Sequence, residues 1–290
     1  MSNLLVHPHA PDSNGCVIEV TPKSAGWQHV GFRVHVLSAG QVTSGGEIGR
    51  ETCIVVLKGT ADIAVEDCRF ERIGGRSSVF DRESPGAVYA PAGMQFTVTA
   101  RDEVELAVCS SPGKPGRAPR MIDAGDMPET VRGTGSNTRY VRNILPESRS
   151  ADSLLVVEVI TPGGHWSSYP PHKHDSATAG TETALEETYY HRINPSQGFA
   201  FQRVYTDTRD IDQTMCVHDG DVVMVPRGYH PVGAAHGYDL YYLNVMAGPD
   251  RAWLFRNDPE HEWLLREPRP GDTEARLSPS APSAARKGGV

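Results

Sequence analysis

The sequence predicts an all-β protein built as two similar barrels in tandem. Short apolar or alternating runs recur along the chain, and each is bounded by Gly, Pro, Asp or Asn, which is typical of strands in a sandwich or barrel. The 29 glycines and 22 prolines supply turns between such strands. The two halves also resemble one another, because Glu51–Gly59 parallels the strand at Glu187 and Gly86–Gln95 parallels Gly220–His230. We interpret this as an internal duplication.

The clearest expected strands divide the chain into two groups. They are 54–57, 61–65, 87–90, 96–99 and 104–108 in the first half, and 153–160, 200–205, 221–225 and 239–245 in the second.

Between these groups the composition changes to Gly, Pro and polar residues that would bury little surface. We therefore expect an N-terminal barrel over 1–118, an interdomain connection over 119–137 and a C-terminal barrel over 138–266. The segment 267–290 has almost no large apolar residues and is expected to be disordered.

Composition excludes several functional classes. The net charge is −8 and there is no cluster of Lys and Arg, which argues against nucleic acid as a partner. No apolar run approaches the roughly 18 residues needed to span a bilayer. The first residues show no secretory signal. The five cysteines are odd in number and lack C-x-x-C spacing, as expected for reduced thiols in a cytoplasmic protein.

The most specific pattern is Pro171-His172-Lys173-His174. Two histidines separated by one residue of a strand point to the same face. Glu187 opens a later strand, and His230 follows a Pro-x-Gly turn that would place it at a barrel mouth. Three imidazoles and one carboxylate suit one divalent metal ion, with zinc expected first and manganese or iron as alternatives.

The carboxylate ligand has competing candidates. Glu187 fits best because it directly precedes a Thr-Tyr-Tyr-His strand; Glu186 is second and Glu182 third. Residues 175–185 form an insertion between His174 and the pair Glu186-Glu187. One possible role for this insertion is a loop at the barrel mouth. In the first half Gln95 stands where His230 stands in the second, and no H-x-H precedes Glu51, so that barrel is expected to hold no metal.

Strand parity ranks the residues around this site. If Glu187 faces the interior, Tyr189 and His191 do so as well. On the next strand Phe201, Arg203 and Tyr205 share a face. An inward-facing Arg203 would bind a substrate carboxylate through a bidentate pair. The alternative, in which Arg203 lies on an outer face in contact with solvent, is equally favoured by the sequence.

The tyrosines near residue 240 are the last candidates. Tyr242 is a substrate-binding candidate together with Tyr189, although Tyr238, Tyr241 and Tyr242 more often belong to a barrel core.

The ordered motifs resemble the two motifs of the cupin superfamily, a double-sheet β-barrel fold. Longer runs are similar to the 5-deoxy-glucuronate isomerase family of bacterial myo-inositol catabolism, from about residue 3 to 265. These runs are 166–175, 185–195, 197–206, 225–233 and 236–248. The resemblance implies a bicupin fold and conversion of 5-deoxy-glucuronate into 5-dehydro-2-deoxy-gluconate. It also implies kinship with 4-deoxy-5-keto-uronate isomerases, which bind zinc through three His and one Glu.

An aldose–ketose isomerisation needs a metal that polarises the carbonyl and a base that carries a proton between adjacent carbons. Glu187 and His191 are both candidates for this base. No redox cofactor is required, and the expected partners are a small sugar acid and further copies of the chain in a homo-oligomer. An iron-dependent cupin dioxygenase and a non-catalytic sugar-binding cupin are the alternative functions.

Overall fold

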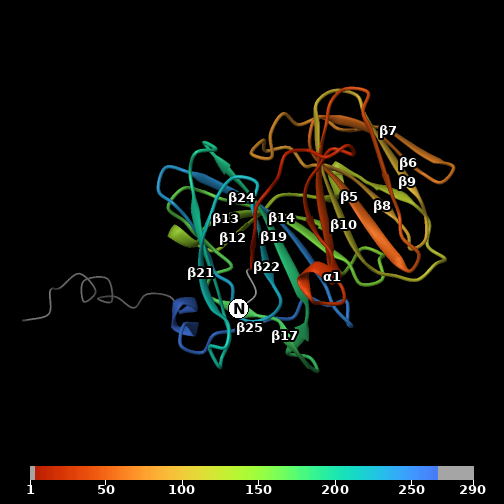
Figure 1. Cartoon of the computed structure of the whole chain (residues 1–290). Helices are drawn as coiled ribbons and strands as arrows, with labels where there is room; N and C mark the ends of the chain where they lie inside the picture. The colour runs from red at the N-terminus through yellow and green to blue at the C-terminus, as the bar shows by residue number, and fades with distance from the viewer. Residues whose placement is uncertain (1–3, 267–290) are drawn as a thin grey trace, which may run out of the picture.

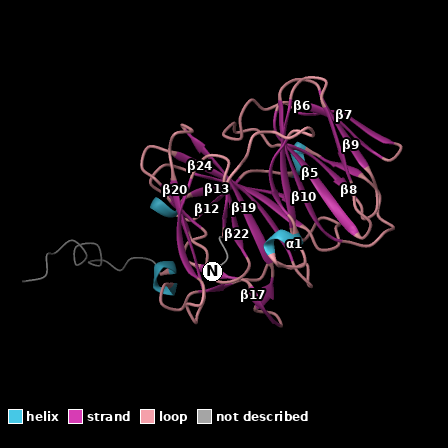
Figure 2. Cartoon of the chain, viewed as in Figure 1, coloured by secondary structure: helices cyan, strands magenta, loops and turns pink. Residues whose placement is uncertain are grey.

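The computed structural model describes residues 4–266, so the expected disorder of 267–290 lies outside the described residues. Strands dominate, and the predicted all-β class is confirmed (Figure 2). The helices are short: α1 (Pro22–Ala25), η1 (Ala124–Asp126), η2 (Gly135–Asn137) and η3 (Glu262–Leu265). Within residues 4–266, none of them has the length and apolar character needed to cross a bilayer.

The N-terminal half consists of a six-stranded sheet, in the order β11-β8-β5-β10-β3-β2, and a four-stranded sheet, in the order β4-β9-β6-β7. Its strands are β2 (Cys16–Val20), β3 (Gly31–Leu37), β4 (Val42–Gly45), β5 (Arg50–Lys58), β6 (Thr60–Val65), β7 (Cys68–Gly74), β8 (Gly86–Ala90), β9 (Phe96–Ala100), β10 (Val104–Pro112) and β11 (Arg120–Ile122).

The C-terminal half has a seven-stranded sheet, β1-β22-β19-β24-β14-β13-β12, a four-stranded sheet, β15-β23-β20-β21, and the pairs β16-β25 and β17-β18. Its strands are β12 (Thr130–Arg132), β13 (Arg139–Leu145), β14 (Leu155–Thr161), β15 (Trp166–Ser167), β16 (His172–Lys173), β17 (Asp175–Thr178), β18 (Glu182–Ala184), β19 (Glu186–Asn194), β20 (Ala200–Tyr205), β21 (Asp212–Val217), β22 (Val222–Val225), β23 (Val232–Ala234), β24 (Asp239–Ala247) and β25 (Arg256–Asn257), joined by β1 (Leu5–Val6) from the N-terminus.

The two large sheets share one topology. The order β8-β5-β10-β3 in the first half corresponds to β22-β19-β24-β14 in the second, as an internal duplication predicts. The connection predicted over 119–137 contains β11, which pairs with β8, and β12, which pairs with β13. This segment therefore contributes one strand to each large sheet.

The large sheets pack against each other, and the largest apolar cluster lies between them. Figure 1 shows β5 and β10 on one side of this interface and β14 and β19 on the other. On β5, Cys53 and Val55 face the interface, whereas Ile54 and Val56 face the interior of their own half. Strands buried on both faces have continuous apolar sequences, which explains the unbroken run at 53–57.

Two glutamates connect the halves in a reciprocal way. The Glu51 carboxylate accepts hydrogen bonds from the backbone N–H groups of residues 152–154, at 2.7, 2.7 and 2.8 Å. The Glu186 carboxylate accepts from the backbone N–H groups of residues 28–30, at 2.7, 2.7 and 3.0 Å. The first group of donors precedes β14 and the second precedes β3, so the contacts follow the same duplication.

We predict that Glu51→Gln and Glu186→Gln each lower the free energy of unfolding by about 1–3 kcal/mol. In each variant an NH2 group replaces one carboxylate oxygen, so a hydrogen-bond donor faces the backbone N–H groups and the negative charge is lost. Urea unfolding measures this. Glu83→Gln, at an exposed position, is the control and should change stability by less than about 0.5 kcal/mol. Unchanged unfolding free energies in both interface variants would contradict the role assigned to these carboxylates.

Candidate metal centre

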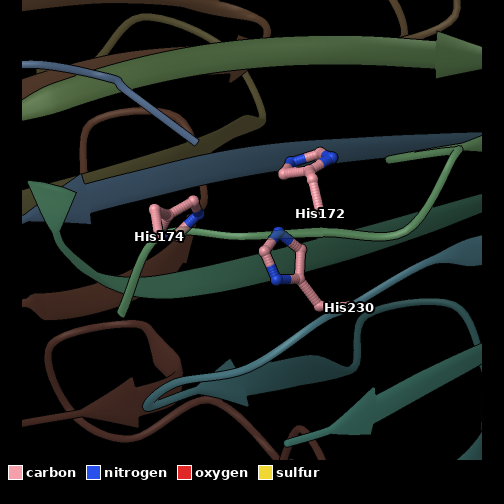
Figure 3. Close-up of side chains that lie close together, drawn as sticks. All are labelled: His172, His174 and His230. Atoms are coloured by element: carbon pink, nitrogen blue, oxygen red, sulfur yellow. The ribbon is translucent and has the colours of Figure 1, made fainter. Parts of the chain in front are cut away.

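Three histidines gather in the C-terminal half, as predicted. His172 lies on β16, His174 follows it, and His230 comes after β22. One ring nitrogen of each lies within 4.8 Å of those of the other two, and Figure 3 shows the three rings close together. Lys173 lies between the two histidines in the sequence, so its side chain points to the opposite face of the strand. Its Nζ forms an ion pair with Asp175 at 2.6 Å. The alternation of the strand therefore separates the histidines from this lysine.

Backbone carbonyls orient two of the rings. Nδ1 of His230 lies 2.8 Å from the carbonyl oxygen of Gly228, and Nδ1 of His174 lies 3.3 Å from that of Leu185. With the proton on Nδ1, His230 leaves its Nε2 lone pair free, which is the usual arrangement of a metal-binding histidine. Nε2 of His174 lies 3.1 Å from Oε2 of Glu187. Within residues 4–266, the buried Nε2 of His230 makes no hydrogen bond. A metal ion would satisfy this atom.

Glu187 completes the group. Its Oε2 lies 3.1 Å from Nε2 of His174 and 3.3 Å from Nε2 of His230. Its Oε1 accepts a hydrogen bond from the side-chain amide of Asn244. The structure thus brings His172, His174, Glu187 and His230 together, and this set of donors fits a divalent metal ion.

The competing carboxylates have other partners. Glu186 precedes Glu187 on β19, so its side chain points to the opposite face and contacts the N-terminal half. Glu182 accepts hydrogen bonds from the backbone N–H groups of Asp175 and Ser176, at 2.9 and 3.1 Å. Neither carboxylate lies with the histidines.

The insertion 175–185 forms the hairpin β17–β18. Asp175 at its start accepts a hydrogen bond, at 2.9 Å, from the backbone N–H of Gly228 in the turn before His230. The hairpin thereby connects the segment that carries His174 to the turn that positions His230.

Burial determines the protonation of two histidines. It lowers the pKa of His172 and of His230 to about 3, because a charged imidazolium is poorly solvated there. Both rings are therefore neutral at pH 7, which is the form that binds metals. For His174, burial acts in the same direction, but the hydrogen bond and charge of Glu187 outweigh it and raise the pKa.

A cavity of about 450 Å³ adjoins His172. Tyr189 and Tyr242, both predicted to contact substrate, line it together with Asn244 and Ser168. The Tyr189 hydroxyl lies 2.8 Å from that of Ser168. The cavity thus presents amide and hydroxyl groups beside the histidines, as a polar small-molecule site requires.

The structure corrects the expected face of Arg203. Its Nε and Nη2 each lie 2.8 Å from a carboxylate oxygen of Asp212, and its side chain is 41% exposed. Its neighbour Gln202 is fully buried and points inward instead. The inward set on β20 is therefore shifted by one residue from the expected one, and Arg203 does not lie with the histidines.

His191, a candidate base, shares the inward face with Glu187 but lies deeper. Its Nε2 is 2.9 Å from Oε1 of Gln202, and the ring is fully buried. Neither His191 nor Glu187 is among the residues that line the cavity. Glu187 is the candidate base that lies with the histidines.

The sequence interpretation missed two kinds of residue around the cavity. Asn244 lies two residues after Tyr242 on β24, so the two side chains share a face. The alternation of this strand could therefore have identified Asn244. Arg132 and Arg139 also line the cavity, but they flank the segment 133–138, and Arg132 itself falls within the predicted connection.

Comparison with known proteins identifies the family. Residues 4–264 match the sequence profile of the KduI/IolB family. The chain belongs to the KduI/IolB family.

Proteins named 5-deoxy-glucuronate isomerase are close in sequence. The one from Geobacillus thermodenitrificans is 54% identical and the one from Bacillus subtilis strain 168 is 49% identical; each alignment covers 91% of this chain, and 97% and 99% of those proteins. The crystal structure of an IolB-like protein from Salmonella typhimurium is 49% identical with a TM-score of 0.88, covering 91% of this chain and 100% of that one.

A more distant neighbour supports the fold. The oxalate decarboxylase of Lactobacillus farciminis has a TM-score of 0.65 at 14% identity, with 96% of this chain and 94% of that chain covered. This likeness in fold agrees with the predicted bicupin architecture.

The N-terminal half lacks the equivalent donors. By strand register Thr52 on β5 corresponds to Glu187 on β19, because Glu51 corresponds to Glu186. Gln95 stands in place of His230, and its amide donates to the backbone carbonyl of Gly46 at 3.2 Å. In residues 4–266, the histidine group is the one cluster of three or more potential metal ligands found.

We predict one equivalent of divalent metal per chain, lost in His230→Ala. The variant should remain folded, since one buried polar side chain is changed and no residue of the apolar clusters is replaced. Metal analysis of the purified protein with circular dichroism checks both statements. Two tightly held equivalents that survive replacement of His172 and His174 would contradict a single site.

The adjacent glutamates provide a matched pair. Glu187→Gln should weaken metal affinity by at least about 10-fold, because the neutral amide is a poorer ligand. Glu186→Gln should keep the metal affinity although it lowers stability. Competition with a chelator of known affinity measures both. Equal affinities in the two variants would exclude Glu187 as a ligand.

Proposed function

We propose that this chain is a metal-dependent aldose–ketose isomerase that converts 5-deoxy-glucuronate into 5-dehydro-2-deoxy-gluconate in myo-inositol catabolism. The isomerase activity is supported by 47–54% identity, over most of the chain, to proteins named 5-deoxy-glucuronate isomerase. The observation that carries the metal dependence is the convergence of His172, His174, His230 and Glu187, of which His172 lines the cavity.

These four residues would hold the metal. Zinc is our first choice because three imidazoles and a carboxylate are common zinc donors, with manganese or iron as alternatives. When bound, the metal would supply Lewis-acid polarisation of the substrate carbonyl.

The remaining chemistry belongs to side chains of the protein. The proton that moves between adjacent carbons requires a base next to the cavity. We assign this role to Glu187, whose carboxylate is held by Asn244 from the cavity wall. The Tyr189 and Ser168 hydroxyls line the same cavity and are placed to bind substrate oxygens.

Two further expectations remain predictions. These are a cytoplasmic location and a homo-oligomeric state, as the family resemblance and the cysteine pattern suggest.

The zinc-loaded protein should convert 5-deoxy-glucuronate into the ketone under anaerobic conditions and without nicotinamide, since isomerisation needs no net redox change. NMR spectroscopy follows the aldehyde and ketone signals. Chelation should stop conversion, and metal should restore it. Activity that requires oxygen would favour a dioxygenase, and full activity in metal-free protein would refute the mechanism.

A further inference from the structure

Two arginines face each other across the hairpin that closes one side of the cavity. Arg132 ends β12 and Arg139 begins β13, and the two residues are direct partners in the antiparallel register. Both line the cavity that also contains His172. Like charges directly opposite one another on paired strands are destabilising. The fold alone therefore gives no reason for this pair.

Neither arginine has an acidic partner within the described residues. Arg139 donates from Nη1 to the backbone carbonyl of Asn137 at 3.0 Å, and the Arg132 guanidinium lies 5.5 Å from the Trp253 ring centre. Burial, followed by the charge of Arg139, lowers the pKa of Arg132. By contrast, Arg76 and Arg142, buried at the interface between the halves, both pair with Glu158, at 2.9 and 3.3 Å.

The turn between the strands leaves room for this arrangement. Gly133 has φ +75°, and a Cβ there would lie 2.2 Å from the backbone oxygen of Asn137 and 2.7 Å from Nη1 of Arg139. Any side chain at this position would thus displace the Arg139 guanidinium or strain the backbone.

We propose that Arg132 and Arg139 form a carboxylate-binding subsite in the wall of the cavity that His172 also lines. An anion placed between the two guanidinium groups would offset their repulsion and accept charge-assisted hydrogen bonds from both. This inference rests on the proposed function, since the sugar acid carries its carboxylate on the terminal carbon opposite the reacting aldehyde. With the carboxylate fixed here, the aldehyde end would be directed toward His172.

The subsite also replaces the role first given to Arg203. That arginine is neutralised by Asp212 on the outer face, whereas Arg132 and Arg139 lie in the cavity wall without an acid.

Calorimetric binding to the zinc-loaded protein tests the proposal with two probes that cannot be isomerised because their C1 aldehyde is reduced to an alcohol: the acid derived in this way from 5-deoxy-glucuronate, and the neutral C6 amide of that acid. Wild-type protein should bind the acid at least about 10-fold more tightly than the amide. Arg132→Gln and Arg139→Gln should each raise the Kd for the acid about 10- to 100-fold and leave the Kd for the amide nearly unchanged. In turnover, KM for 5-deoxy-glucuronate should rise more than kcat falls.

Arg101→Gln is the matched control, because this arginine pairs with Asp62 at 2.7 Å on the surface of the N-terminal half. Thermal unfolding separates a folding defect from lost recognition. Removing one of two opposed cations should leave the midpoint temperature of unfolding unchanged or raise it. A variant with a lower midpoint that binds the acid and the amide equally poorly would contradict the proposal.

The outcomes distinguish the subsite from the activity. A wild-type protein that prefers the acid but forms no ketone, with the preference lost in both variants, would refute the proposed function and support the subsite. The subsite proposal would be overturned if wild-type protein forms ketone but binds both probes equally. It would also be overturned if the arginine variants keep the preference for the acid. In both cases the proposed activity would stand.

Discussion

Burial of strand β19 on both faces is the constraint on which the rest of the structure depends. Its first two residues show this directly, since Glu186 points into the interface with the N-terminal half and Glu187 points to the histidines. Further along, Tyr190 packs in the interface cluster and Tyr189 packs inside the C-terminal half. A shift of one residue would exchange the two sets. The contacts between the halves therefore help to hold the ligand carboxylate in place.

Duplication accounts for the reciprocal contacts between the halves, and within residues 4–266 the cluster of histidines is found only in the C-terminal half. Both halves use a buried glutamate at the start of the corresponding strand, Glu51 on β5 and Glu186 on β19, to bind backbone N–H groups of the other half. The next residue differs, being Thr52 in one half and Glu187 in the other. The scaffold function is thus shared by both copies, whereas the donor set for a metal is present in one.

The sequence predicted those features that follow from strand periodicity and turn chemistry. The all-β class, the shared face of His172 and His174 and the shared face of Glu187, Tyr189 and His191 all follow from a period of two. The face of Arg203 was wrong because parity gives only relative directions within a strand, and nothing in the sequence of β20 fixes which set points inward. The pair Arg132 and Arg139 was missed because their pairing depends on a hairpin within a segment rich in turn residues.

The central claim is that β19 and the H-x-H segment build one metal site in the C-terminal half. Anomalous diffraction from crystals of the zinc-loaded protein, recorded on both sides of the zinc absorption edge, tests it most directly. The account predicts one strong peak about 2.0–2.3 Å from a ring nitrogen of His172, His174 and His230 and from a carboxylate oxygen of Glu187. A peak beside Thr52 and Gln95, or one bound by Glu186 or Glu182 instead of Glu187, would contradict it.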